Sequence, residues 1–160
     1  MTAQLLEVDK VTLRYETERG TVTALESASF AVAKADRLVL LGPSGCGKSS
    51  LLKSIGGYLP PVTGQIRLHG QAVIEPGPDR MMVFQEFDQL LPWKTVRGNV
   101  LFPLVASGRA KGSAALERAE RAISKVRLSP FSQAYPHTLS GGMKQRVAIA
   151  RAMAMEPDVL

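Results

Sequence analysis

The chain has 160 residues, enough for one domain with a hydrophobic core, and its 45% hydrophobic and 21% charged residues are typical of a soluble globular protein. Its net charge of +6 comes from dispersed lysines and arginines, which argues against a nucleic-acid partner. No apolar run reaches the roughly 18 residues that span a bilayer, and no signal peptide is recognisable. The single cysteine, Cys46, excludes an internal disulfide and a multi-cysteine zinc site.

The N-terminal part of the chain predicts three strands. Loose alternation of apolar residues over 6–15 predicts an edge strand, and a second strand is expected at 28–32, after a turn at Gly20. The continuous apolar run at 37–41 is typical of a strand buried on both faces of a parallel sheet.

A glycine-rich loop leads from the third strand into a helix. Residues 49–55 predict a helix that buries Leu51, Leu52 and Ile55 on one face. The alternation of apolar and polar residues over 65–70 then predicts a half-buried antiparallel strand.

The second half of the chain predicts a short strand followed by helices. Residues 81–84 form an apolar run with Gln85 at its end, which indicates another buried strand. Thr95 and Ser113 are expected to cap two helices, and Ser140 to begin a third that runs to about Met155. The inward positions expected in the helix after Ser113 are Leu116, Ala119, Ile123 and Val126. Together these elements predict an α/β fold with an antiparallel β appendage.

The residues Gly42-x-x-x-x-Gly47-Lys48-Ser49 match the phosphate-binding P-loop pattern at every required position. Glycines let backbone N–H groups curl around an anion, and the following helix directs its positive end at the same phosphates. Lys48 supplies a charge for the terminal phosphates, and the Ser49 hydroxyl is a candidate ligand for Mg²⁺. The candidate nucleotide-binding residues are Gly42, Pro43, Ser44, Gly45, Cys46, Gly47, Lys48, Ser49 and Ser50.

A second motif narrows the class of nucleotide-binding protein. The segment 139–152, Leu-Ser-Gly-Gly-Met-Lys-Gln-Arg-Val-Ala-Ile-Ala-Arg-Ala, resembles the signature helix of ABC-type ATPases. The P-loop lies upstream, in the order usual for that family. The resemblance implies a P-loop ATPase core with a helical signature subdomain. It divides the chain into a nucleotide-binding core at 1–84, a Q-loop and helical subdomain at 85–139, and the signature helix with the start of the next strand at 140–160.

The resemblance also assigns roles to residues outside the P-loop. In such proteins two ATPase domains enclose ATP head to tail, so each signature faces the partner's P-loop. Gln85 resembles the glutamine that senses Mg²⁺ and the attacking water, which makes it the candidate catalytic residue and, with Ser49, a candidate metal ligand. Tyr15 matches the aromatic residue that stacks on adenine, although a simple core tyrosine fits the sequence as well. The residues expected to contact ATP in trans are Ser140, Gly141, Gly142 and Gln145.

The segments around Gln85 point to a subfamily. Residues 76–80, 90–96 and 135–137 are similar to those of importers for nitrate, alkanesulfonates, taurine and related small anions. In that group this region receives a helix of the membrane permease, so Trp93 is either an anchor for it or a core residue. The implied partners are a second copy of the ATPase, two permease subunits and, indirectly, a substrate-binding protein. The implied location is the cytoplasmic face of the cell membrane.

The family pattern continues beyond Leu160 with a strand that carries a Mg²⁺-orienting aspartate and a catalytic glutamate. The sequence as given is therefore expected to be an incomplete ATPase, with an uncovered strand edge, poor solubility and no hydrolysis of its own. Two interpretations follow: part of a working importer subunit, or a non-hydrolysing remnant that binds nucleotide or a partner ATPase. A soluble ABC ATPase of DNA repair or translation is disfavoured by the Leu-Pro-Trp segment at 91–93.

Overall fold

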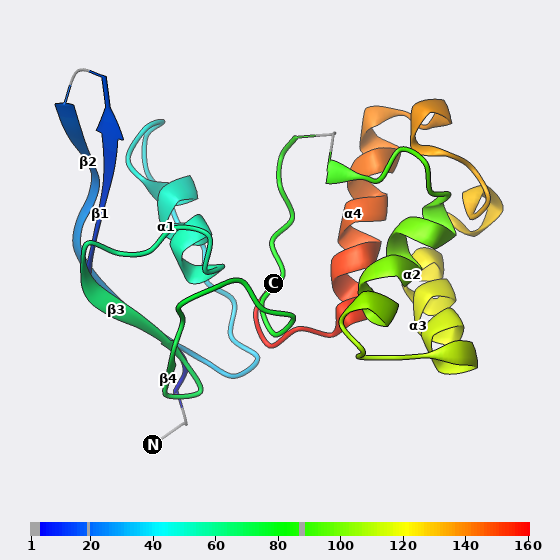
Figure 1. Cartoon of the computed structure of the whole chain (residues 1–160), viewed down its shortest axis with the longest axis horizontal. Coiled ribbons are helices and arrows are strands. Elements are labelled where there is room, and N and C mark those ends of the chain that lie inside the picture. The colour runs from blue at the N-terminus through cyan, green and yellow to red at the C-terminus, as the bar shows by residue number, and fades with distance from the viewer. Residues whose placement is uncertain (1–3, 19, 87–88) are drawn as a thin grey trace. The chain divides into compact units, whose positions relative to one another are not determined.

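The computed structural model describes residues 4–18, 20–86 and 89–160, and the chain divides into two compact units, Met1–Gly77 and Pro78–Leu160 (Figure 1). Within these ranges, the first unit holds a sheet and one α-helix, and the second holds three α-helices. The α/β class is confirmed. The boundaries predicted at 84/85 and 139/140 stay predictions. No helix within the described ranges is both long and apolar enough to cross a membrane.

The first unit contains a four-stranded antiparallel sheet in the order β2-β1-β3-β4. Its strands are β1 (Gln4–Thr17), β2 (Gly20–Ala33), β3 (Thr63–Leu68) and β4 (Gln71–Ala72). The first strand is not the edge strand that the sequence predicted, because Val8 faces Phe30 of β2 on one side and Ile66 of β3 on the other. Register shifts interrupt the β1–β2 ladder, and they explain why the alternation in the sequence is only loose.

The predicted strand at 37–41 does not form. These residues adopt no regular structure, and Leu38, Val39 and Leu41 are 50%, 73% and 89% exposed. A parallel strand is stable only when neighbouring strands take up its backbone hydrogen bonds, and none of the described strands pairs with this run.

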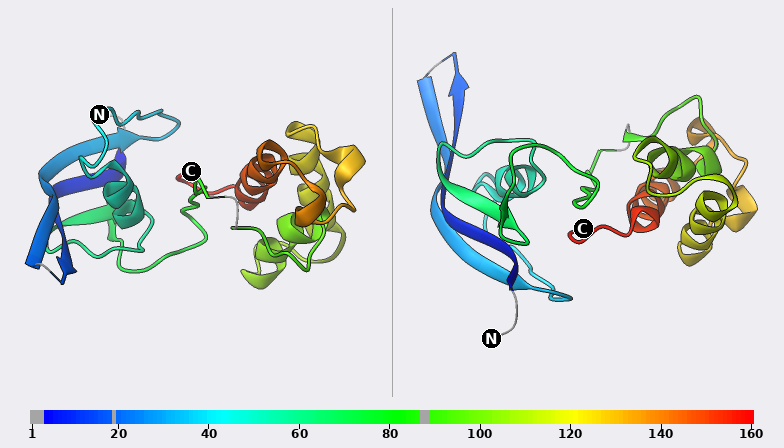
Figure 2. Two further views of the ribbon diagram at one scale, coloured as in Figure 1. Left: turned by 90° about the horizontal axis from the view of Figure 1, so that it is seen from above. Right: turned by 60° about the horizontal axis from the view of Figure 1, so that its bottom comes forward.

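Helix α1 (Lys48–Ile55) follows the glycine-rich loop and lies on one face of the sheet in both views of Figure 2. Leu51 and Ile55 are buried as predicted, but Leu52 is 47% exposed and Ser54 is buried instead. Positions i and i+4 share a helix face, whereas the adjacent position is rotated by about 100°. The prediction of Leu52 as a core residue is therefore wrong.

The second unit is a helical bundle (Figure 1). It comprises α2 (Val96–Ala106), α3 (Gly112–Lys125) and α4 (Gly141–Met155), with 3₁₀ turns at Ser129–Phe131 and Pro136–Thr138. The predicted caps of α2 and α4 are confirmed, because Thr95 Oγ1 accepts from the N–H of Gly98 at 3.1 Å and Ser140 Oγ from that of Met143 at 3.3 Å.

Helix α3 differs from its prediction at both its start and its buried face. It begins at Gly112, with Lys111 at the N-cap, so Ser113 is not the cap. Leu116 is 42% exposed, and its neighbour Ala115 is buried in its place. The buried positions that bear out the prediction are Ala119 and Ile123, while Val126 is half-buried. Small alanines on this face allow α3 to pack closely in the bundle.

The predicted strand at 81–84 also lacks regular structure, and its residues are half-buried. One element of a parallel sheet is present at its start: Arg80 forms an isolated parallel bridge with Val159, and the N–H of Met81 donates to Val159 O at 2.9 Å. The segment after α4 thus runs beside residues 80–81.

Asn99 is the buried polar side chain on which the start of α2 depends. Its Oδ1 accepts from the N–H of Leu91 at 2.8 Å, and its Nδ2 donates to the carbonyls of Leu91, Lys94 and Thr95 at 3.0–3.1 Å. We expect Asn99→Ala to lower the free energy of unfolding by about 2–4 kcal/mol, because buried backbone groups lose their partner. Urea denaturation followed by circular dichroism measures this. Ser124→Ala, at an exposed position of α3, is the control and should change stability by less than about 0.5 kcal/mol.

Candidate functional site

The P-loop has the conformation that its glycines predict. Gly45 and Gly47 have φ angles of 82° and 87°, which side chains strongly disfavour. A Cβ on Gly47 would lie 2.1 Å from the carbonyl oxygen of Ala24 in β2. Glycine at 47 is therefore required twice, by the backbone angle and by the close approach of the loop to the sheet.

The side chain of Lys48 turns back over the loop. Its Nζ donates to the carbonyl oxygens of Gly42 at 2.8 Å and Pro43 at 2.6 Å, and it lies 3.4 Å from Cys46 Sγ. The ammonium group is thereby held against the backbone of the glycine-rich loop.

The N-terminus of α1 supplies the remaining features of an anion site. Gly47 is the N-cap in the left-handed conformation and, among the described residues, no side chain caps this helix. The first-turn N–H groups are thus left for a ligand, and the helix dipole favours a negative one. Ser49 is exposed in the same turn. A hydroxyl oxygen in this place has the donor chemistry that Mg²⁺ prefers.

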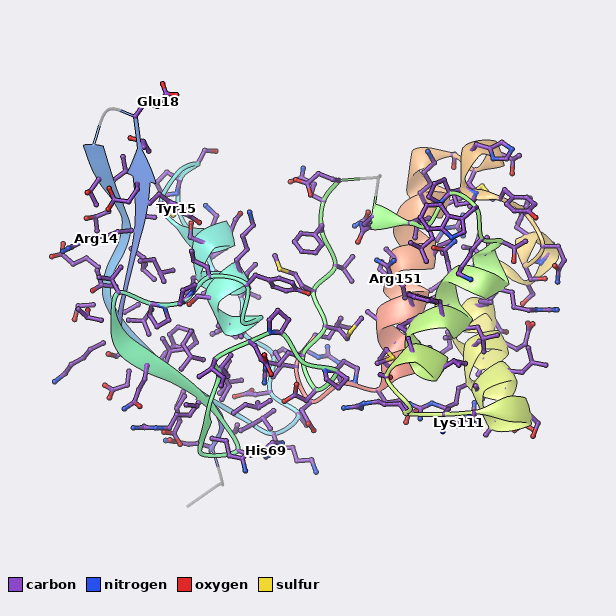
Figure 3. All side chains as sticks on the ribbon, viewed as in Figure 1. Arg14, Tyr15, Glu18, His69, Lys111 and Arg151 are labelled. Carbon is purple, nitrogen blue, oxygen red and sulfur yellow. The ribbon has the colours of Figure 1, made fainter. Side chains whose placement is uncertain are left out.

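Tyr15 extends from β1 towards α1 (Figure 3), and its hydroxyl donates to Ser50 Oγ at 3.0 Å. The side chain is 37% exposed, so a simple core position is wrong. Its place beside the P-loop helix is compatible with adenine stacking, which stays a prediction.

The signature residues lie at the N-terminus of α4. Ser140 is its N-cap and is exposed, and Gly141 and Gly142 are the first two helical residues. Apart from its chain neighbours and the backbone of its own helix, no described atom lies within 4 Å of a Cβ built on Gly142. Ser140 Oγ takes the N–H of Met143, and the absence of side chains on both glycines leaves the preceding N–H groups of this helix end uncovered for a ligand.

Gln85 is exposed, at a bend between the segment 81–84 and α2. The carbonyl of Phe84, the preceding residue, accepts from Nε2 of Gln145 at 3.0 Å and from Nε2 of Gln89 at 2.8 Å. Sequence reasoning missed Gln89, since an isolated glutamine in a loop carries no signal of its partners. Gln145 was predicted to contact ATP in trans, and that role stays a prediction.

The structure brings the P-loop, Tyr15 and Ser50 together in the first unit, and Gln85 and the signature helix together in the second.

The second unit also exposes aromatic side chains. Trp93, Phe102 and Tyr135 are 69%, 48% and 44% exposed, and Lys94 Nζ lies 5.2 Å from the ring centroid of Phe102. The alternative that Trp93 is a core residue is wrong. Exposed aromatic residues of this kind are typical of a surface that binds another protein.

The sheet with its P-loop helix and the helical bundle with its signature define an ATP-binding cassette. The chain belongs to the ABC transporter family, whose model matches residues 25–160. The resemblance found in the sequence is thus confirmed.

Among relatives, the taurine import ATP-binding protein TauB of Rhizobium johnstonii is 46% identical over 160 residues, covering 98% of this chain and 59% of the relative. The nitrate import ATP-binding protein NrtD of Synechococcus elongatus is 41% identical over 157 residues, covering 97% of this chain and 57% of the relative. The chain thus spans less than two thirds of the length of these relatives.

A similar solved structure is a dimeric ATP-binding cassette, MJ0796, in a post-hydrolysis state bound to ADP and Pi. It matches with a TM-score of 0.85 and 30% sequence identity, over 96% of this chain and 71% of that chain. The fold class predicted from the sequence is confirmed.

Proposed function

We propose that this chain is the nucleotide-binding part of an ATPase subunit that powers import of a small anion, of the nitrate, sulfonate or taurine kind. The observation that carries the proposal is the P-loop geometry, in which the Lys48 ammonium is held on the carbonyls of Gly42 and Pro43 beside an uncapped helix N-terminus. The names of the relatives support the transported class, since taurine and nitrate importers are both among them.

In this proposal the P-loop amides and Lys48 bind the phosphates of ATP, and Tyr15 contacts the adenine. The Ser49 hydroxyl and the Gln85 carboxamide would hold Mg²⁺, which when bound neutralises charge on the phosphates. Gln85 also orients the attacking water. Ser140, Gly141 and Gly142 donate to the terminal phosphate of ATP held by a second copy, so binding draws two copies together head to tail.

Closure of this dimer is passed to two permease subunits through the exposed aromatic side chains Trp93, Phe102 and Tyr135. The protein then works at the cytoplasmic face of the membrane, without nucleic acid, downstream of a substrate-binding protein. The dimeric state of the similar cassette supports the pairing of two copies.

The test uses the protein product of the gene, expressed in its own cells. Uptake of labelled taurine and nitrate is compared in cells with and without the gene, and the tagged protein is purified from detergent-solubilised membranes. We expect ATP turnover, loss of uptake of one of these anions on deletion, and recovery of a permease with the tag. Recovery with DNA or ribosomes instead would contradict the importer role. ATP binding without turnover would favour the non-hydrolysing alternative.

A further inference from the structure

The carboxamide of Gln89 holds the turn formed by Phe84, Gln85 and Glu86. Its Oε1 accepts from the N–H of Phe84 at 3.2 Å, and its Nε2 donates to the carbonyls of Phe84 and Glu86, both at 2.8 Å. One side chain thus binds the backbone immediately before and immediately after Gln85. The acceptor and the donor of this primary amide are therefore both engaged with the backbone of Phe84 and Glu86.

The same turn is fastened to the signature helix α4. Nε2 of Gln145 donates to Phe84 O at 3.0 Å, and Oε1 of Gln145 accepts from Nε2 of Gln89 at 3.4 Å. Nη1 of Arg151, labelled on α4 in Figure 3, donates to the backbone carbonyl of Gln89 at 2.7 Å. Gln145 and Arg151 lie about 9 Å apart along the helix axis. Because α4 holds this segment at two separated points, Gln145 and Arg151, the segment cannot rotate about either contact alone.

We propose that Gln89 and Gln145 are positioning residues, which lock the turn carrying Gln85 to α4 so that Gln85 and the signature move as one body. The inference rests on the proposed function for its role in ATP turnover. Both carboxamides are occupied by groups of this same unit, whereas Gln85 between them is exposed. We call the hydrogen bonds of Gln89 and Gln145 to this turn the brace. When α4 shifts as two copies close, the brace would carry Gln85 with it. The coupling would then depend on hydrogen bonds and not on side-chain volume.

Methionine is close to glutamine in length and shape but lacks the amide, so Gln89→Met and Gln145→Met remove the hydrogen bonds with little change in volume. The first measurement is hydrogen exchange by mass spectrometry on the encoded protein without nucleotide, at the peptide that carries the Phe84 amide. We expect exchange about tenfold faster in each variant. Gln133→Met, at an exposed position of the same unit, is the control and should leave exchange at this peptide unchanged.

The second measurement separates positioning from plain stability. We expect kcat for ATP to fall roughly five- to tenfold in Gln89→Met and in Gln145→Met. KM for ATP should stay within about twofold in Gln89→Met, because that variant changes neither the P-loop nor a residue assigned to ATP contact. The double variant should be no worse than the single ones, since both substitutions break one network. A purely structural role would instead lower the Tm and the active fraction, and leave the kcat of the folded enzyme unchanged.

Unchanged exchange at the Phe84 peptide in both variants would overturn the brace, whatever the protein does with ATP. Faster exchange with unchanged kcat, in a protein that hydrolyses ATP, would overturn the positioning role while the proposed function stands. If the unsubstituted protein binds no ATP, the proposed function fails by itself, and the exchange measurement still decides whether the brace exists.

Discussion

Lys48→Ala is expected to weaken ATP binding by about 10- to 100-fold and to abolish turnover. The ammonium group lies against the backbone of the loop, on the carbonyls of Gly42 and Pro43 at 2.8 and 2.6 Å. From there it would form charge-assisted hydrogen bonds with the terminal phosphates, each contributing about 1.5–3 kcal/mol. Alanine removes this charge, so that only the backbone amides of the loop would still bind the phosphates. Isothermal titration of the encoded protein with ATP measures the affinity directly.

The matched control is Lys53→Ala, which removes the same charge from an exposed position in the last turn of α1. We expect its ATP affinity to stay within about twofold of the unsubstituted protein, because a charge this far along the helix is screened by solvent. Equal losses in both variants would mean that general electrostatic attraction, and not the position of Lys48 in the loop, determines affinity. That result would remove the main support for the proposed site.

The parts of the structure that the sequence predicted correctly are those set by short stretches of chain. Thr95 and Ser140 cap their helices because each hydroxyl meets an N–H three residues along the same chain. The P-loop conformation follows equally locally, from glycines at 45 and 47 whose φ angles few other residues adopt.

The parts that the sequence did not predict depend on neighbours distant in the chain. Apolar residues at 37–41 signal a buried strand, but a strand exists only with partners for its backbone, and none of the described strands pairs with this segment. On the buried faces of α1 and α3 the sequence prediction was wrong at Leu52 and Leu116, because it favoured large apolar residues over the smaller Ser54 and Ala115, which are buried. The Gln89–Gln145 contact joins residues far apart in sequence, so no local sequence pattern predicts it.

Gly141→Asp is expected to spare ATP binding by a single copy and to prevent the pairing of two copies on ATP. Gly141 is the first residue of α4 and lies next to the N-cap Ser140. A carboxylate here interacts favourably with the positive end of the helix, so folding should be preserved. The same carboxylate would compete for the N–H groups that we assign to the partner's phosphate, and would repel that phosphate.

The size of this effect follows from symmetry. A head-to-tail dimer contains the substitution twice, and loss of a charge-assisted hydrogen bond costs about 1.5–3 kcal/mol at each site. The dimer Kd should therefore rise about 100-fold or more. Light scattering with ATP in the absence of divalent cations, which stalls hydrolysis, measures this pairing. Gln133→Asp, which adds the same charge at an exposed position of the second unit, should pair normally. If Gly141→Asp also pairs normally and still supports uptake, the end of α4 does not contact nucleotide in trans, and the signature helix must act through its own unit alone.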